Sequence, residues 1–384
     1  MKRLIRRLTH PQSDKVIQKG ATTEKAAQNA PDTMLETPPQ QDRNTMADSS
    51  AAFQNREANT STSSHTHDMI YKYSYVPDFF KNYADIADSS LNGKVSTQPA
   101  LGILEKEYDG ESANPTTNGE RAQQWVRFTN YIQELNRRHI NDGTSYKLLY
   151  IIRHGQGIHN VKMDELKVAE EAGTLEIIDG KPLNWKNYWS HEDGDGKVIW
   201  ADAQLVDKGI RQAQDLAKLW IDEAQKDALP LPGTVYTSPL ARCLETTRLA
   251  YTPVMARHGR RLQAVIKENL RERITDHTCD RRSTRSWIER NYPDYTIEEG
   301  FSEEDKSWDV TKSESLEQHV VRIQRLFDEI FSNDASPIIS LTTHSYALTA
   351  ILALVGYPKF LVNEGTIVPL FIKAEKVTQN TPPS

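Results

Sequence analysis

An arginine and a histidine stand together as Arg153-His154, directly after the short apolar run 148–152. A run of this length between polar residues predicts a buried strand of a mostly parallel sheet. Both side chains then lie at the strand's C-terminal edge, where open α/β sheets bind ligands. This pair suits phosphoryl transfer, because the histidine attacks phosphorus while the arginine neutralises the non-bridging oxygens. The glycines that follow allow close approach to an anion, and Asn160 adds a hydrogen-bonding amide.

Three further stretches bring similar groups to predicted strand ends. Arg242 falls on the first turn of a helix that starts near Pro239, by the positive end of the helix dipole. His344 ends an apolar run, and Glu268 and Glu272 follow another. Cleavage of a phosphate ester needs a proton donor for the leaving oxygen, and a carboxylic acid with a raised pKa can serve. The ordinary alternatives are a surface arginine, a structural histidine and solvated acidic residues.

Other motifs resemble functional sites but fail on context. The sequence 256–259 repeats the letters Arg-His-Gly, yet Pro253 interrupts what precedes it and no apolar run leads into it. We therefore predict His258 to be an exposed loop residue. The stretch 193–204 fails as a calcium loop, because its fifth position is Lys197. Cys279 is predicted to pack rather than to act as a nucleophile.

Short strands and amphipathic helices alternate along the chain and must position these residues. The periodicity predicts helices over about 124–138, 162–172, 205–226, 313–331 and 346–355. It predicts strands over about 148–152, 235–237, 263–267, 337–343 and 366–373. An aromatic insertion up to about Ala203 could build walls for a substrate. The aromatic stretch 71–80 reads either as a lid over the substrate or, as we favour, as plain packing.

Composition limits the classes of function. The 384 residues carry a net charge of -6, which gives no pull toward nucleic acid or membrane. The two cysteines favour a reducing compartment, so we expect a cytoplasmic and also nuclear location. The basic residues 1–10 keep a mitochondrial presequence as the alternative. Residues 1–66 are too polar to form a core and are predicted to be a disordered tail, followed by one domain over 67–376 and a C-terminal tail over 377–384.

The first motif, with its continuation to Asn160, resembles the histidine phosphatase superfamily. Within its phosphoglycerate-mutase-like branch, the fungal phosphomutase-like proteins carry the same Arg-His-Gly-x-Gly-x-His-Asn. Ser-Pro-Leu-x-Arg242 resembles the family's second-arginine motif, Leu-x-Glu272 its acid position and Thr-His344 its second histidine. The motifs stand in the family's order, and the resemblance covers about residues 71–376.

The resemblance implies a three-layer α/β/α sandwich with a mostly parallel central sheet. It also implies that His154 is a nucleophile that forms a phosphohistidine, and that Glu272 protonates the leaving group, with Glu268 as the competing acid. The phosphoryl oxygens would be held by Arg153, Asn160, Arg242 and His344. No metal and no cofactor are required, because arginines and histidines supply the positive charge.

The resulting prediction is a phosphomonoester hydrolase that acts on a small phosphorylated metabolite and has no nucleic-acid or membrane partner. The sequence does not indicate its oligomeric state. Mutases of the family carry Arg-His-Gly-x-Ser-x-Trp-Asn, whereas this chain has Gly157 and His159 at the two differing positions. The alternatives are a phosphomutase of the same fold and a catalytically silent protein that binds a phosphorylated ligand. A pure binder has no need of a leaving-group acid.

Overall fold

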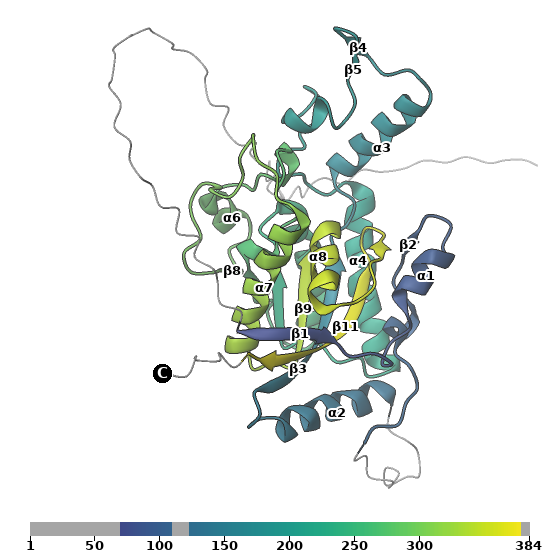
Figure 1. Cartoon of the computed structure of the whole chain (residues 1–384), viewed down its shortest axis with the longest axis vertical. Helices are drawn as coiled ribbons and strands as arrows, with labels where there is room; N and C mark the ends of the chain where they lie inside the picture. The colour runs from purple at the N-terminus through teal and green to yellow at the C-terminus, as the bar shows by residue number, and fades with distance from the viewer. Residues whose placement is uncertain (1–69, 110–122, 378–384) are drawn as a thin grey trace, which may run out of the picture. The chain divides into compact units, whose positions relative to one another are not determined.

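The computed structural model describes residues 70–109 and 123–377, so the predicted tail over 1–66 and the end of the chain lie outside the described part (Figure 1). The helices are α1 (Tyr83–Ser89), α2 (Gln124–Arg138), α3 (Ile158–Glu171), α4 (Asp207–Lys226), α5 (Ala241–Arg257), α6 (Arg285–Asn291), α7 (Leu316–Asn333) and α8 (Ser345–Val355). The strands are β1 (Tyr71–Tyr75), β2 (Lys94–Val95), β3 (Thr144–Arg153), β4 (Ile177–Ile178), β5 (Lys181–Pro182), β6 (Thr234–Thr237), β7 (Ala264–Ile266), β8 (Thr296–Ile297), β9 (Ile338–Thr343), β10 (Leu361–Val362) and β11 (Ile367–Lys376). None of the described helices has the length and apolarity needed to cross a membrane.

The main sheet has seven strands in the order β1-β11-β3-β9-β6-β7-β8. The strands from β3 to β8 in this order run parallel, whereas β11 is antiparallel to both β1 and β3. Arg153 at the end of β3 pairs with Thr343 at the end of β9. His154 and His344, each the next residue in the chain, are therefore delivered side by side to one edge of the sheet.

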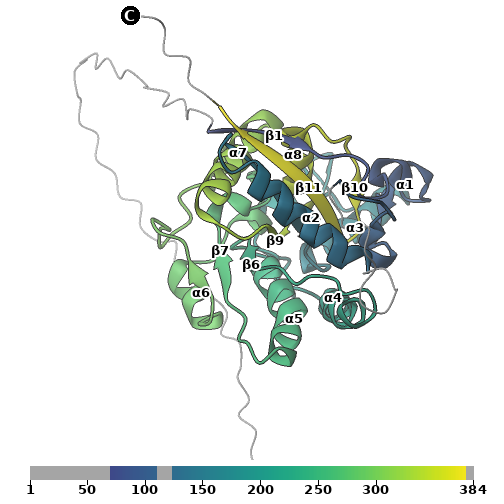
Figure 2. The same ribbon diagram turned by 90° about the horizontal axis from the view of Figure 1, so that it is seen from below.

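Helices cover both faces of the sheet (Figure 2). Leu149 and Ile151 of β3 pack in a cluster with α7 and α8, whereas Leu148, Tyr150 and Ile152 pack with α2, α4 and α5. Successive side chains of a strand point to opposite faces, so a strand that is apolar at every position is buried on both. The fold is the predicted three-layer α/β/α sandwich with a mostly parallel central sheet.

The longest amphipathic helices follow the predicted periodicity. α2 has the predicted bounds, and its Trp125 and Ile132 are fully buried. α7 starts slightly later than predicted, because Ser315 caps it: the Ser315 hydroxyl accepts from the backbone N–H of Gln318, whose side chain accepts in return from Ser315 N. Leu316, the first residue of the helix, is 39% exposed, because the buried face starts about a turn later.

Two local predictions were wrong, and the edge strand β1 was not predicted. α3 begins at Ile158 instead of about residue 162, so Asn160 lies in its first turn. Pro253 does not interrupt α5, because the turns on either side of it are buried and tertiary packing outweighs one lost backbone hydrogen bond. The aromatic stretch Tyr71–Tyr75 is an edge strand, β1, paired with β11. A single short edge strand gives little periodic signal.

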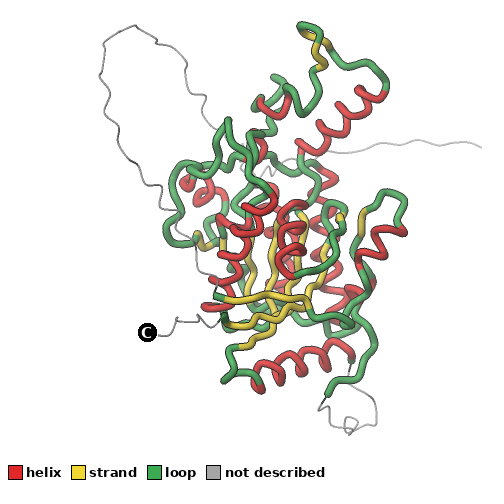
Figure 3. The backbone as a smooth tube through the Cα atoms, viewed as in Figure 1, coloured by secondary structure: helices red, strands yellow, loops and turns green. Residues whose placement is uncertain are grey.

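A segment that we call the arm, residues 172–201, leaves the end of α3 and carries the β4–β5 hairpin away from the sheet (Figures 1 and 3). Its Trp185 and Trp200 pack with Ala203 and Cys279 in a small hydrophobic cluster distinct from those of the sheet. The indole N–H of Trp200 donates to two backbone carbonyls of the arm. The predicted aromatic insertion is therefore a folded extension with its own small core.

The aromatic stretch before the first long helix packs on the sheet and does not form a lid. Phe79 is 5% exposed, and its ring centroid lies 4.9 Å from that of Phe371 and 5.3 Å from that of Phe128. We expect Phe79→Ala to lower the free energy of unfolding by about 3–5 kcal/mol, as for other buried aromatic truncations. Urea unfolding measures this loss, and Phe80→Ala, at a half-buried position, should cost less. A large loss of turnover at unchanged stability would instead indicate a lid.

Candidate active site

His154 lies at the end of β3, nearly fully buried, with its ring orientation fixed. Its Nδ1 lies 2.7 Å from the carbonyl oxygen of Gly155, so Nδ1–H donates there and Nε2 keeps its lone pair. Burial, followed by the guanidinium groups of Arg242 and Arg153, holds the pKa of His154 well below its ordinary value. The imidazole is therefore neutral at physiological pH, which is the nucleophilic form.

The turn after His154 lies directly on two helices. A Cβ at Gly155 would lie 2.3 Å from the carbonyl oxygen of Gly209 in α4, so only glycine allows this backbone contact. The N–H of Gly155 donates to Thr246 of α5 at 3.0 Å, and that of Gln156 to the Gln212 side chain of α4 at 2.8 Å. These contacts hold the histidine-bearing turn on the sheet.

Both predicted arginines face His154 and keep part of their hydrogen-bonding capacity. Arg153 donates to the Val362 carbonyl at 2.6 Å and pairs with Glu364 at 2.6 Å. Arg242, 1% exposed, donates to the Cys279 carbonyl at 2.7 Å and pairs with Asp280 at 3.2 Å. The Nε of each guanidinium is buried without a partner among the described residues. Their charges and free donors suit a phosphoryl group.

His344 follows β9 as the N-cap of α8 and is fully buried. Its ring centroid lies 5.0 Å from that of His154. Its Nε2 lies 2.8 Å from the Ser238 hydroxyl and 3.3 Å from the Cys243 sulfur. Burial and then Arg242 hold the pKa of His344 well below its ordinary value, so this ring is also neutral.

Asn160 has a structural contact within its own helix. Its side-chain oxygen accepts from the backbone N–H of Gly157 at 3.0 Å and closes the N-terminus of α3. Only its amide NH₂ remains to meet a phosphate. Its proposed phosphate contact is compatible with this geometry but stays a prediction.

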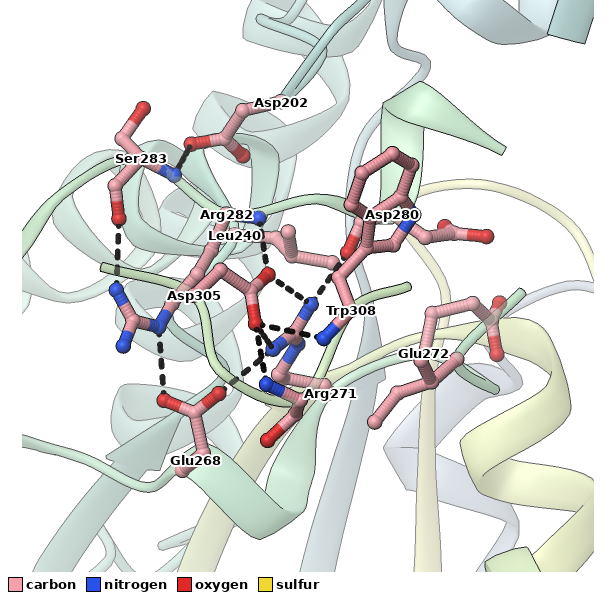
Figure 4. A network of polar contacts seen from close by, with 12 residues as sticks. Asp202, Leu240, Glu268, Arg271, Glu272, Asp280, Arg282, Ser283, Asp305 and Trp308 are labelled. Atoms are coloured by element: carbon pink, nitrogen blue, oxygen red, sulfur yellow. Dashed lines mark hydrogen bonds and ion pairs between the residues drawn. The ribbon is translucent and has the colours of Figure 1, made fainter. Parts of the chain in front are cut away.

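The two competing acids have different surroundings (Figure 4). Glu268 accepts from Arg271 at 2.6 Å and from Arg282 at 2.9 Å, so both of its carboxyl oxygens are engaged by buried guanidinium groups. Among the described residues, Glu272 accepts only from backbone N–H groups, those of Arg273 at 2.8 Å and Tyr346 at 3.1 Å. Burial, and then the repulsion of Asp280, raises the pKa of Glu272. This favours Glu272 over Glu268 as the proton donor.

Buried ion pairs fix the loop that carries Glu272. Arg271, immediately before it, is fully buried and pairs with Asp305 at 2.6 Å and with Glu268 at 2.6 Å (Figure 4). The Asp202 carboxylate accepts from Ala241 N at the start of α5 and from Ser283 N, both at 2.8 Å. The same residue thus joins the end of the arm to the first turn of α5, next to Arg242.

Both arginines of the segment 277–282 have internal partners. Arg281 pairs with Asp193 of the arm at 2.8 Å. Arg282 pairs with Glu268 and also donates to backbone carbonyls of the 302–304 segment. Both guanidinium groups therefore contribute to internal contacts of the fold.

One group of possible metal ligands lies beside Arg242. Ligand atoms of His277, Cys279 and Asp280 lie within 4.8 Å of one another. However, one Asp280 oxygen accepts from Arg242, and the other accepts from Thr275 at 2.7 Å. Burial also raises the pKa of the Cys279 thiol well above its usual value. A neighbouring guanidinium and a protonated thiol fit a metal ion poorly, so we read this group as structural.

Three residues that were not predicted to have a functional role complete the site. His159, whose ring centroid is 5.9 Å from that of His154, could have been noticed within the first motif. Ser238, beside His344, stands next to a conspicuous proline. Asp280, the partner of Arg242, had no local signal. His258 is exposed at the C-cap of α5, the opposite end of that helix from Arg242.

Several known proteins are similar to this chain. The model of the histidine phosphatase superfamily (branch 1) matches residues 189–360. A protein of Arthroderma benhamiae named "Probable phosphoglycerate mutase" is 35% identical over 309 residues, which span 80% of this chain and 85% of that protein. "Phosphomutase-like protein 3" of Candida albicans is 28% identical over 243 residues, 63% of this chain and 70% of that protein. The crystal structure of the alpha-ribazole phosphatase from Shigella flexneri aligns with 19% identity and a TM-score of 0.33, over 61% of this chain and 96% of that one.

The chain belongs to the histidine phosphatase superfamily. Within it, the fungal relatives place the chain in the phosphoglycerate-mutase-like branch. Members of this superfamily are phosphatases or mutases, so the class of chemistry is transfer of a phosphoryl group.

Proposed function

We propose that this protein hydrolyses small phosphomonoesters through a phosphohistidine at His154. The observation that carries the proposal is the state of this side chain: a neutral imidazole, with Nδ1 donating to the Gly155 carbonyl, beside Arg153 and Arg242. Nε2 attacks phosphorus and the bond from phosphorus to the ester oxygen breaks. Arg153, Arg242, His344 and the Asn160 amide hold the non-bridging oxygens.

Glu272 supplies the proton that the leaving oxygen needs. Its raised pKa favours the protonated form that the first step needs, and the proton passes to the departing alcohol. In the second step the Glu272 carboxylate takes a proton from water, and the resulting hydroxide attacks the phosphohistidine. Inorganic phosphate leaves and His154 returns to its neutral form, so every proton is accounted for.

A phosphomutase is the second candidate, because relatives carry that word in their names. A mutase passes the phosphoryl group to a substrate hydroxyl and must exclude water. Gly157 and His159 depart from the serine and tryptophan of the mutase motif, and the arm adds a large extension beside the site. Both differences favour hydrolysis.

The deciding experiment gives the protein 3-phosphoglycerate with a 2,3-bisphosphoglycerate primer and measures 2-phosphoglycerate and inorganic phosphate together. In parallel, a panel of phosphorylated metabolites is tested for phosphate release. We expect phosphate release to dominate. Efficient isomerisation with negligible phosphate release would establish the mutase, and neither activity on any substrate would favour a silent binding protein.

A further inference from the structure

His159 is a buried histidine inside the site to which the proposed reaction gives no role. It is the second residue of α3 and is 6% exposed. Its ring is tilted by 45° to that of His154, with the centroids 5.9 Å apart. Its Nδ1 is buried and has no hydrogen-bond partner among the described residues. Since nearly all buried polar atoms are paired in native proteins, this one calls for an explanation.

The chain makes room for this ring by having a glycine two residues earlier. A Cβ at Gly157 would lie 2.8 Å from both Cε1 and Nδ1 of His159. Any other residue at 157 would push the imidazole away from its position. Gly157 and His159 therefore act as a pair, and both differ from the serine and tryptophan of the mutase motif.

The groups that face His159 come from every element around it and are all cationic or neutral. They are Arg153 and His154 at the end of β3, Arg242 on α5, His277 on the loop that also carries Cys279, and His344 at the start of α8. Burial, and then Arg242, His154 and Arg153, holds the pKa of His159 well below its ordinary value. An anion bound among these groups reverses the local field and favours the imidazolium.

We propose that His159 binds the phosphoryl group as an imidazolium, so that a dianion entering the site takes up one proton from solvent. The proton goes to the His159 ring, which then donates to an oxygen of the anion. This inference rests on the anion site of the proposed function and adds a ligand-binding residue to it. Substrate binding should accordingly strengthen as pH falls.

The test is calorimetric titration of the full chain with sodium sulfate in two buffers that differ in ionisation enthalpy. Sulfate stays a dianion at neutral pH, so any proton taken up goes to the protein. For the wild type we expect close to one proton per sulfate and a Kd that rises by up to about tenfold per pH unit. His159→Gln keeps a donor but cannot titrate, so its proton count should fall to near zero and its pH slope should flatten. His159→Phe should also weaken sulfate binding about tenfold or more through the lost charged hydrogen bond.

His277→Gln is the matched control, since it removes a neighbouring, more exposed histidine and should leave the proton count unchanged. The proposal would be overturned if the wild type and His159→Gln took up equal numbers of protons per sulfate. It would also be overturned if His277→Gln abolished the proton uptake. Absence of proton uptake in the wild type overturns it even if neither His159 variant folds. The readout does not need turnover: a protein that takes up the proton but releases no phosphate from any ester would refute the hydrolase and leave this inference standing.

Discussion

Replacing His154 with asparagine should abolish covalent labelling by a phosphorylated substrate and lower kcat by at least about 10⁴-fold, the scale seen when a nucleophile is removed from other covalent enzymes. The reason is that, among the histidines that the structure describes, only His154 combines a neutral ring, a fixed Nδ1 and two neighbouring arginines. Labelled protein should be quenched in alkali, because phosphohistidine is labile in acid.

His258→Asn is the control for this experiment. His258 belongs to the second Arg-His-Gly sequence but is exposed at the end of α5. We expect full labelling and unchanged turnover in this variant. If His258→Asn loses the label while His154→Asn keeps it, the site has been placed at the wrong histidine.

Glu272→Gln should slow hydrolysis of an alkyl phosphate such as glycerol phosphate by about 10²–10⁴-fold, the usual contribution of a general acid. The first step with p-nitrophenyl phosphate should change much less, because its phenolate leaves without a proton. Rapid mixing with this substrate should then show phosphoenzyme accumulating, since the second step has lost its base. Glu268→Gln is the control: its carboxylate is bound by Arg271 and Arg282, so we expect a loss of stability with the leaving-group dependence unchanged.

The dependence of kcat on pH should reflect the roles assigned to His154 and Glu272. The reaction needs His154 unprotonated and Glu272 protonated, and the pKa of the first is lowered while that of the second is raised. For an alkyl ester, kcat should therefore fall on the acid side as His154 takes up a proton, and on the alkaline side as Glu272 loses one. Glu272→Gln should remove the alkaline limb. An alkaline limb that persists in this variant would assign it to another group.

The sequence alone was sufficient to predict those elements whose formation depends on a local pattern of apolar and polar residues. α2 and the buried strand β3 could be read from periodicity, because burial of one or both faces imposes it over many residues. The end of a parallel strand predicts where side chains meet, and Arg153, His154 and His344 were found in this way. The choice of Arg242 and Glu272 depended further on the family resemblance.

What could not be predicted depends on contacts between distant parts of the chain. Arg242 meets Asp280 and Arg271 meets Asp305 across loops that have no periodicity. For the same reason, the sequence does not indicate that Arg281 and Arg282 form ion pairs in the fold. The burial of His159 could not be predicted either, because it depends on how α3 packs near Arg153 and Arg242.

The separate small core of the arm has a consequence for how this chain can change. Trp185 and Trp200 pack in a cluster separate from those of the sheet, together with Ile158 and Leu166 of α3 and the loop around Cys279, and Asp202 joins the end of the arm to α5. Substitutions and length changes before Asp202 therefore need not disturb the sheet or the nucleophile. In evolutionary terms the arm is an exchangeable module, and grafting the arm of a relative at Glu171 and Asp202 offers a route to altered substrate preference with the chemistry preserved.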